Sequence, residues 1–247
     1  MKLSHKKFPY SIGGTILLSS ALLLSLSACG TAGRQAAAQP PADAGQNEID
    51  SDTASEDSAS AEGKLAIKII GKSLITYFAV AENSNVDAVS SASVLPDTGL
   101  GLVRTIADDI QSVTGSELFS IQTTVDYPGD IDDLLDYAED EQDDNARPEL
   151  TDHIADLADY DNIFIGFPTW WYDLPQVMYS FFDEYDFSGK TIIPFNVHNG
   201  SRFSGTIKTI QKLEPEANVI TDGFTVHQSD VGAAGGEVTD WLRGLEL

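Results

Sequence analysis

Three short segments carry the residue types best suited to binding a ligand, and each follows a run of apolar residues. The first is small and polar, and its backbone N–H groups and hydroxyls suit a phosphate. The second is aromatic and suits stacking on a flat ring. The third is polar with a glycine, which suits hydrogen bonds to a ring edge and close backbone approach. The segments are Ala79, Val80, Ala81, Glu82, Asn83 and Ser84; Pro168, Thr169, Trp170, Trp171, Tyr172 and Asp173; and Asn196, Val197, His198, Asn199, Gly200 and Ser201.

Alternating strand and helix patterns must position these segments. The middle strand runs are apolar throughout, as expected where helices cover both faces of a parallel sheet. We therefore predict a doubly wound α/β domain, with a five-stranded parallel sheet in a three-layer sandwich. Ligands of such sheets lie at the carboxyl ends of the strands, where all three segments fall. The predicted strands are 65–70, 74–80, 118–121, 162–167, 191–197, Val219 and 224–226, and the predicted helices are 102–113, 148–157, 175–182, 207–213 and 238–245.

Two stretches interrupt this alternation. Residues 127–147 are dominated by Asp and Glu and predict a solvated acidic insertion, with a helical turn at 131–137. Residues 85–98 separate the first segment from the next helix, so the sequence gives no reason to place that helix N-terminus at a phosphate. Ser90, Ser91 and Ser93 lie in this second stretch and could supply hydroxyls instead.

The composition excludes several functions. A formal net charge of −25 opposes binding to nucleic acid, and the carboxylates serve either solubility or docking of a basic partner. The single cysteine cannot form an intrachain disulfide or a thiolate-held cluster, so redox chemistry requires a bound cofactor. His198 has no His or Cys at metal-ligand spacing, and Ser201 lacks the Gly-x-Ser-x-Gly context of a hydrolase nucleophile.

The first thirty residues have the pattern of an export signal. Three lysines precede an apolar run over residues 12–26 that is short for a membrane span. The segment Leu26-Ser27-Ala28-Cys29-Gly30 resembles the lipobox of bacterial lipoproteins, which implies lipidation of Cys29 and anchoring to the outer face of the bacterial cytoplasmic membrane. We predict a signal peptide over 1–29, a disordered tether over 30–63 and a folded domain over 64–247.

Four segments of the domain resemble a known family in their order and spacing: Tyr77-Phe78, residues 146–150, residues 166–171 and residues 185–195. From about Ser73 to the C-terminus, the chain is similar to a flavodoxin of the lipoprotein-associated type. The resemblance implies that the first segment holds the phosphate of flavin mononucleotide (FMN), and that the second and third contact the isoalloxazine. At the phosphate loop, Ala81-Glu82-Asn83-Ser84 stands where the family usually has Thr-Gly-Asn-Thr.

This resemblance implies a membrane-tethered carrier that passes electrons through FMN to or from a redox partner protein with a basic docking face. Two alternatives remain open. One is an FMN-dependent NAD(P)H:quinone-type reductase, although the sequence has no second glycine-rich turn for a dinucleotide. The other is a degenerate flavodoxin fold that acts as a binding module without flavin.

Overall fold

The computed structural model describes residues 69–85, 90 and 93–245. The predicted signal peptide, the tether, Cys29 and the predicted domain start at Lys64 lie outside the described residues. In the part described, no helix is long and apolar enough to cross a membrane.

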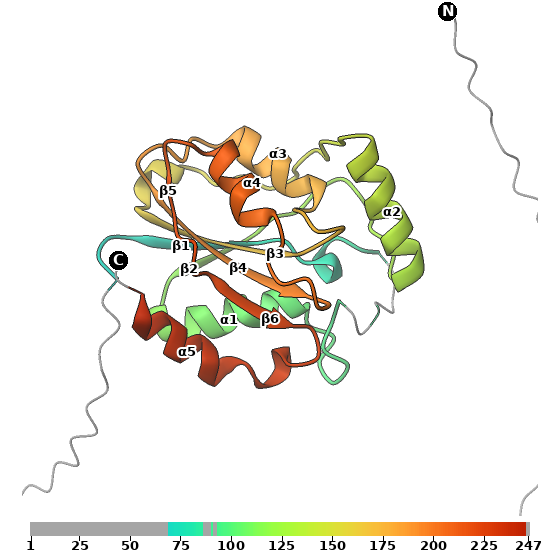
Figure 1. The fold of residues 1–247 in the computed structure, drawn as a ribbon, viewed down its shortest axis with the longest axis horizontal. Coiled ribbons are helices and arrows are strands. Elements are labelled where there is room, and N and C mark those ends of the chain that lie inside the picture. The colour runs from blue at the N-terminus through green and yellow to red at the C-terminus, as the bar shows by residue number, and fades with distance from the viewer. Residues whose placement is uncertain (1–68, 86–89, 91–92, 246–247) are drawn as a thin grey trace, which may run out of the picture. The chain divides into compact units, whose positions relative to one another are not determined.

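A parallel sheet forms the middle layer (Figure 1). Its strand order is β2-β1-β3-β4-β5. Both β5 and β6 pair with β4: β5 with its first two residues, and β6 with its last four. The predicted doubly wound, five-stranded parallel fold is therefore confirmed. The strands are β1 (Ser73–Tyr77), β2 (Glu117–Ser120), β3 (Asn162–Pro168), β4 (Thr191–His198), β5 (Asn218–Val219) and β6 (Phe224–His227).

Helices form the two outer layers. In Figure 1, α1 and α5 lie together on one side of the sheet, and α3 and α4 lie on the other side, with α2 beside α3. The helices are α1 (Leu102–Thr114), α2 (Ile131–Asp143), α3 (Gln176–Glu184), α4 (Thr206–Leu213) and α5 (Gly235–Gly244). Short 3-10 turns occur at Val80–Glu82, Leu157–Asp159 and Val231–Ala233.

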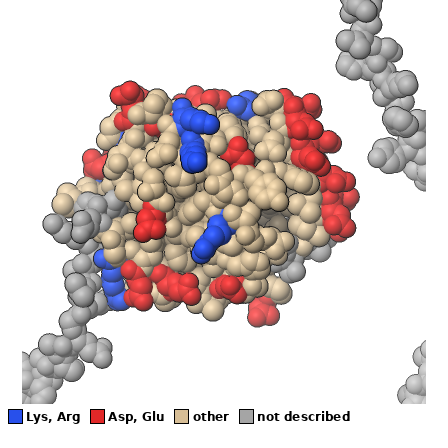
Figure 2. Space-filling view, viewed as in Figure 1, with Lys and Arg blue, Asp and Glu red and all other residues tan. Residues whose placement is uncertain are grey.

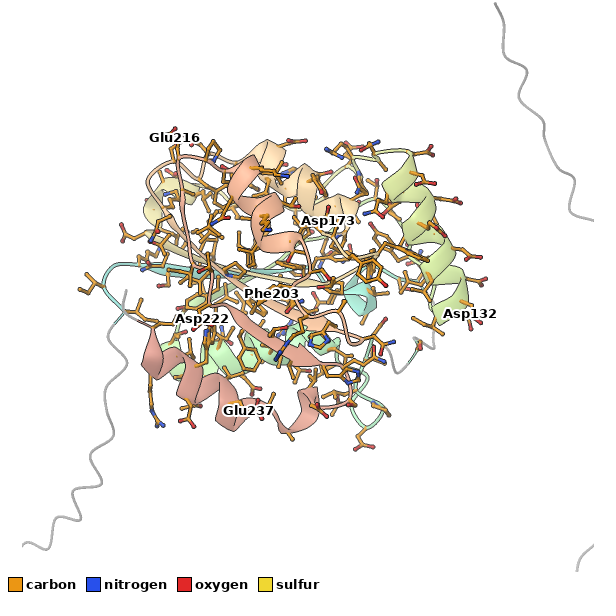
Figure 3. All side chains as sticks on the ribbon, in the orientation of Figure 1. Asp132, Asp173, Phe203, Glu216, Asp222 and Glu237 are labelled. Atoms are coloured by element: carbon orange, nitrogen blue, oxygen red, sulfur yellow. The ribbon has the colours of Figure 1, made fainter. Side chains whose placement is uncertain are left out.

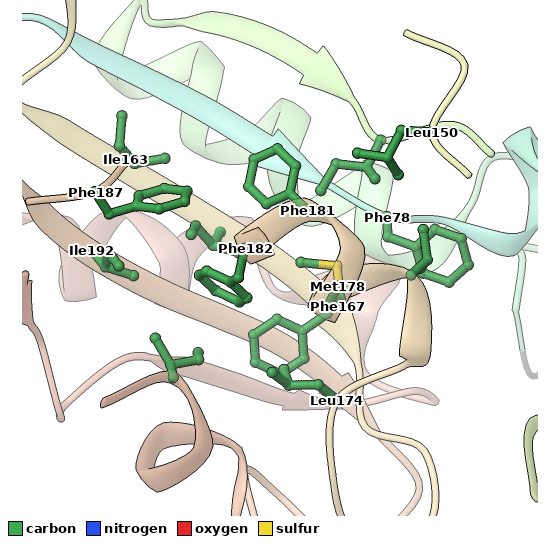
Figure 4. Packing of buried hydrophobic residues seen from close by; sticks show 14 of the residues in the cluster. Phe78, Leu150, Ile163, Phe167, Leu174, Met178, Phe181, Phe182, Phe187 and Ile192 are labelled. Atoms are coloured by element: carbon green, nitrogen blue, oxygen red, sulfur yellow. The ribbon is translucent and has the colours of Figure 1, made fainter. Parts of the chain in front are cut away.

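The inner strands are buried on both faces because successive side chains point to opposite layers. In β3, Ile163 and Ile165 enter the core under α3, whereas Phe164 enters the core under α1 and α5. Figure 4 shows the α3 core, in which Phe181, Phe182 and other side chains of α3 pack on the sheet. The uninterrupted apolar runs of the sequence follow from this double coverage.

A glycine in β3 makes room for an aromatic ring in the next strand. Gly166 pairs with Phe195 of β4, and a Cβ atom at Gly166 would overlap the Phe195 ring. Only glycine therefore fits at this position without displacing the ring.

Two sequence-based predictions in the crossover from β2 to β3 were wrong. The acidic stretch was predicted to be a solvated insertion with one helical turn, but it forms the helix α2, which spans 13 residues. Its N-cap, Asp130, accepts hydrogen bonds from the Asp132 and Asp133 amides, and the acidic first turn favours the helix dipole. Leu134 and Ala138 bury its inner face.

The helix predicted over 148–157 is absent. The backbone there instead pairs with the chain that leaves β2: Leu150 forms an antiparallel bridge with Thr123, and the Thr151 amide donates to the Gln122 carbonyl. The predicted strand over 65–70 falls mostly outside the described residues, and Ile69 and Ile70 belong to no strand.

Candidate functional site

A cavity of about 390 Å³ opens at the carboxyl ends of β1, β3 and β4. The strand order reverses between β1 and β3, so the cavity lies at the position where ligands of doubly wound sheets bind. All three predicted segments reach it. Eight of their residues line the cavity: Ala79, Val80, Pro168, Thr169, Trp170, Val197, His198 and Asn199.

The other ten residues of the three segments do not line this cavity: Ala81, Glu82, Asn83, Ser84, Trp171, Tyr172, Asp173, Asn196, Gly200 and Ser201. Several of them shape the loops instead. Asn83 is buried, and its amide donates to the carbonyls of Ala79 and Ile121 (3.0 and 3.1 Å), while its Oδ1 accepts from the Thr123 amide (2.9 Å). The Ser84 hydroxyl donates to the Tyr127 carbonyl (2.7 Å).

Glu82 does not line the cavity, and its carboxylate instead binds a cation and two hydroxyl groups. Its carboxylate forms an ion pair with Arg104 (3.2 Å) and accepts hydrogen bonds from the hydroxyls of Tyr77 and Ser120. Burial, followed by the Glu82 charge, raises the pKa of Tyr77 to about 12, so this phenol remains a hydrogen-bond donor. The Glu82 carboxylate, which the sequence places in the expected phosphate loop, is therefore already paired with Arg104, Tyr77 and Ser120.

The start of α1 lies beside the end of β1, despite the intervening residues 85–98. Leu102 and Val103 line the cavity together with Ala79 and Val80, and a Cβ atom at Gly101 would lie 3.0 Å from that of Ala79. A bridge between Val94 and Gly101 returns the chain to this point. The sequence did not indicate this closeness, because the bridge is a tertiary feature.

Hydroxyl groups of the second interrupting stretch also reach the cavity. Ser90 and Ser93 both line it, and Ser91 lies outside the described residues. The Ser93 carbonyl accepts a hydrogen bond from the Leu102 amide at the start of α1 (2.9 Å).

The aromatic segment separates its two tryptophans. Trp170 is half-buried, lines the cavity and packs edge-on against Phe78 and Tyr127, with ring centroids 5.6 and 5.5 Å away. Trp171 and Tyr172 have φ values of 44° and 66° and form the tip of a tight turn that Trp170 and Asp173 close. Such backbone conformations are costly for bulky residues and occur mainly where the surroundings impose them.

A hydrogen bond joins this turn to α2. The Trp171 indole N–H donates to the Leu135 carbonyl of α2 (2.9 Å). Figure 3 shows Asp173 on the loop after β3 and Asp132 on α2, away from the sheet. The bond therefore links the turn to α2, which forms one wall of the cavity.

The third segment provides a positioning amide and a histidine. The Asn196 amide donates to the Thr169 hydroxyl (2.6 Å) and to the Arg202 carbonyl (2.9 Å), which joins the second and third segments. His198 accepts a hydrogen bond from the Gly200 amide at Nδ1 (2.9 Å), so its neutral ring carries the proton on Nε2. Burial, and then His227, lowers the pKa of His198, which keeps the ring neutral near pH 7.

One wall of the cavity comes from α2, where the sequence analysis predicted only a helical turn at 131–137. Ile131, Leu134, Leu135 and Ala138 of α2 line the cavity, and Gln228 contributes from the end of β6. The apolar spacing at 131, 134, 135 and 138 was the signal for this wall, but surrounding carboxylates obscured it. Among the described residues, no cluster of three His, Cys, Asp or Glu side chains could hold a metal ion.

The outer face of α2 is acidic. Figure 2 shows carboxylates gathered along the edge of the molecule where α2 lies, with few basic residues on the same face. The exposed acidic residues of this acidic face are Asp132, Asp133, Asp136, Glu139, Asp140 and Asp143. The helix whose inner side chains line the cavity thus carries a strongly negative outer face.

Comparisons with known proteins agree with this architecture. The model of a protein family described as flavodoxin matches residues 96–244. No curated protein matches the chain.

Three solved structures are similar over most of their lengths. A proposed flavoprotein from Bacteroides uniformis is 28% identical, with a TM-score of 0.55 over 70% of this chain and 98% of that one. A proposed flavoprotein from Bacteroides eggerthii is 21% identical, with a TM-score of 0.51 over 68% and 98%. A flavoprotein from Lactobacillus acidophilus, solved in complex with FMN, is 22% identical, with a TM-score of 0.48 over 66% and 97%.

Proposed function

Because the chain belongs to the flavodoxin family, we propose that it binds FMN in the cavity at the ends of β1, β3 and β4 and carries electrons through it. The observation that carries this proposal is the position of the cavity, at the switch point of the sheet between an aromatic and a polar segment. Bound FMN would supply the redox chemistry, and the protein would bind and orient it.

The residues at the ring end of the cavity fit an isoalloxazine. Trp170 offers an indole that its edge-on contacts with Phe78 and Tyr127 hold in place. Thr169 and Asn199 add polar groups, and neutral His198 adds an N–H donor at Nε2. An aromatic surface with a few polar groups at its border is the usual composition of a site for a flat heterocycle.

The wall formed by α2 is apolar. Leu134, Leu135 and Ala138 of α2 face the cavity, and the Trp171 hydrogen bond ties this helix to the loop after β3. Since a low-dielectric surrounding strengthens hydrogen bonds to the ring, this wall would favour tight binding and an orientation set by His198 and Thr169.

We favour a carrier over a reductase because of charge and because the sequence lacks a second dinucleotide-binding turn. The acidic face belongs to α2, whose inner side lines the cavity, and it would slow an anionic nicotinamide dinucleotide while attracting a basic redox protein. In this proposal, the lipid on Cys29 anchors the carrier at the outer face of the membrane, and the tether over residues 30–63 allows the domain to reach its partner.

Flavin binding can be tested by titrating FMN with the purified full-length chain and following the fluorescence of the flavin. We expect quenching that saturates at one flavin per chain, since packing against Trp170 places the ring beside an indole. Fluorescence that stays unchanged at protein concentrations of about 100 μM, which corresponds to binding weaker than about −5 kcal/mol, would contradict the proposal.

A further inference from the structure

The helix α2 borders two cavities. Its inner face lines the proposed flavin cavity with Ile131, Leu134, Leu135 and Ala138. Another cavity, of about 350 Å³, lies at its C-terminal end. The residues that line this second cavity are Val125, Tyr137, Asp140, Glu141, Asp144, Ala146, Arg147 and Pro148. One helix therefore forms a wall of the flavin cavity and also holds a carboxyl group, Glu141, in a separate acidic cavity.

Glu141 is buried although it can carry a charge. It is 7% exposed, and the Tyr127 hydroxyl donates to its carboxylate (3.4 Å). Asp140 and Asp144 line the same cavity and bring no compensating positive charge. Because burial removes the water that stabilises an ionised carboxylate, it raises the pKa of Glu141 to about 7.

The basic residue of this second cavity is engaged elsewhere. Among the residues that line it, all of them described, Arg147 is the only Lys or Arg. Its guanidinium pairs with Asp183 of α3 (3.0 Å) and donates to the Gln176 side chain (3.0 Å). Glu141 therefore shares its cavity with a cation that is already paired with another carboxylate.

Tyr127 connects Glu141 to the flavin cavity. Tyr127 is 1% exposed, and its ring packs edge-on against Trp170 and Tyr137, with centroids 5.5 and 5.6 Å away. Burial, and then the Glu141 charge, raises the pKa of both tyrosines, so both phenols stay protonated while Glu141 titrates. Since Trp170 lines the flavin cavity, a continuous series of contacts joins the two cavities.

An outward displacement of α2 would change both cavities at once. Glu141 would reach water, and the flavin cavity would lose the wall that Leu134 and Ala138 form. A protonated Glu141 therefore favours the packed helix, whereas an ionised Glu141 favours the displaced one. The contribution of Glu141 to the packed arrangement is complete below about pH 4.5 and is lost as the pH rises through about 7.

From these contacts we infer that Glu141 is a pH-sensitive switch for ligand binding: its protonated carboxyl keeps α2 packed over the flavin cavity, and its ionisation loosens this wall. The inference rests on the flavin site proposed above and adds regulation to it. The flavin binds more tightly in mildly acidic than in alkaline surroundings, and the bistable element is α2.

The direct test compares FMN binding by the full-length parent and by Glu141→Gln at about pH 5 and pH 8, using flavin fluorescence. We expect the ratio of the two dissociation constants, parent over variant, to rise by about fivefold to 50-fold between these pH values. The FMN phosphate, His198 and His227 titrate in both proteins, so the ratio isolates Glu141. Glu139→Gln, at an exposed position of α2, is the control and should follow the parent.

The outcomes of this titration separate the inference from the proposed function. FMN binding with the same ratio at both pH values would overturn the switch and leave the flavin site intact. FMN binding by neither protein at either pH would contradict the proposed function, and the switch with it.

Hydrogen exchange of the flavin-free chain tests the movement of α2 itself. After correction for the intrinsic effect of pH, we expect α2 amides to exchange about fivefold faster or more, relative to α1 amides, at pH 8 than at pH 5. Glu141→Gln should remove this difference, and Glu141→Met serves the same purpose if the first variant does not fold. Equal relative exchange of the parent at both pH values would contradict the switch.

Discussion

Trp170 and Trp171 are adjacent in the sequence but lie in different surroundings. Trp170 faces the cavity and is anchored by Phe78 and Tyr127, whereas Trp171 is 39% exposed at the tip of a turn and bonds to α2. The residue types alone predicted an aromatic contact with the ligand without choosing between the two. The backbone of the turn, with positive φ at Trp171 and Tyr172, separates them.

This difference predicts unequal effects of the two truncations. Trp170→Ala should weaken FMN binding by about 1–3 kcal/mol, the range measured for stacking of bases on aromatic side chains. Trp171→Ala should cost less, since it removes an indirect contact through α2. Flavin fluorescence titration measures both variants, and equal parental affinity in both would place the flavin away from this segment.

Residues that position the loops were hard to recognise in the sequence. Asn83 and Asn196 were predicted to bind the ligand, yet Asn83 joins the chain after β1 to the chain after β2, and Asn196 joins the two later segments. An Asn side chain at a strand end can either bind a ligand or hold two loops together, and the residue type does not distinguish these roles. Its partners are distant in sequence, so only the fold separates the two roles.

At the scale of elements, α2 shows where sequence periodicity succeeds and fails. The strands and four of the helices follow apolar patterns strong enough to predict them. In α2, four apolar residues at helical spacing lie among carboxylates. The helix is stabilised by the Asp130 cap and by the burial of Leu134 and Ala138 on its inner face. The apolar spacing after Pro148 predicted a helix. Residues 149–151 instead form backbone hydrogen bonds with residues 122–124, which follow β2.

Glu141 makes the stability of α2 sensitive to pH. It is only 7% exposed, its carboxylate accepts from the Tyr127 hydroxyl (3.4 Å), and burial raises its pKa from 4.5 to about 7. The folded state therefore holds this proton more tightly than the unfolded state. The associated stability is present below about pH 4.5 and is lost as the pH rises through about 7.

Glu141→Gln should remove this loss, because an amide keeps an acceptor for Tyr127 without a charge. We expect the variant to be more stable than the parent by about 1–3 kcal/mol at pH 8 and nearly equal to it at pH 4.5. Urea denaturation at the two pH values measures the difference. Glu139→Gln, at an exposed position of the same helix, is the control, and a gain of equal size at both pH values would contradict the role of ionisation.

At the scale of the whole molecule, the order of strands and helices was predictable because every inner strand is covered on both faces. Parallel strands joined by crossovers then restrict the topology to a few solutions. The Val94–Gly101 bridge that precedes α1 and the cavity wall from α2 were beyond such rules, since both depend on tertiary contacts.

The proposed anchor predicts a simple change in behaviour. Cys29→Ser should leave the chain without lipid, because the thiol accepts the acyl group and the sequence has no other cysteine. Partitioning between detergent and aqueous phases after expression in a bacterium measures this. Equal partitioning of the variant and the parent into detergent would contradict the lipid anchor.

The charge of the chain predicts how its redox partner is recognised. With a net charge of −25 and an acidic face beside the cavity, reduction by a basic redox protein should be fast at low salt. The rate should fall as ionic strength approaches about 0.15 M, where the screening length is about 8 Å. Stopped-flow measurements test this, and rapid saturable oxidation of NAD(P)H by the flavin-loaded protein with a quinone acceptor would instead indicate a reductase.

The central claim is that the cavity at the ends of β1, β3 and β4 holds a flavin. The visible absorbance spectrum of the purified chain, recorded after incubation with excess FMN and removal of free ligand by gel filtration, tests it most directly. The account predicts a yellow protein with the spectrum of oxidised flavin, bleached by dithionite and weaker in the Trp170→Ala variant. A colourless parent chain that ignores both FMN and riboflavin would contradict the account and leave the fold as a binding module of another kind.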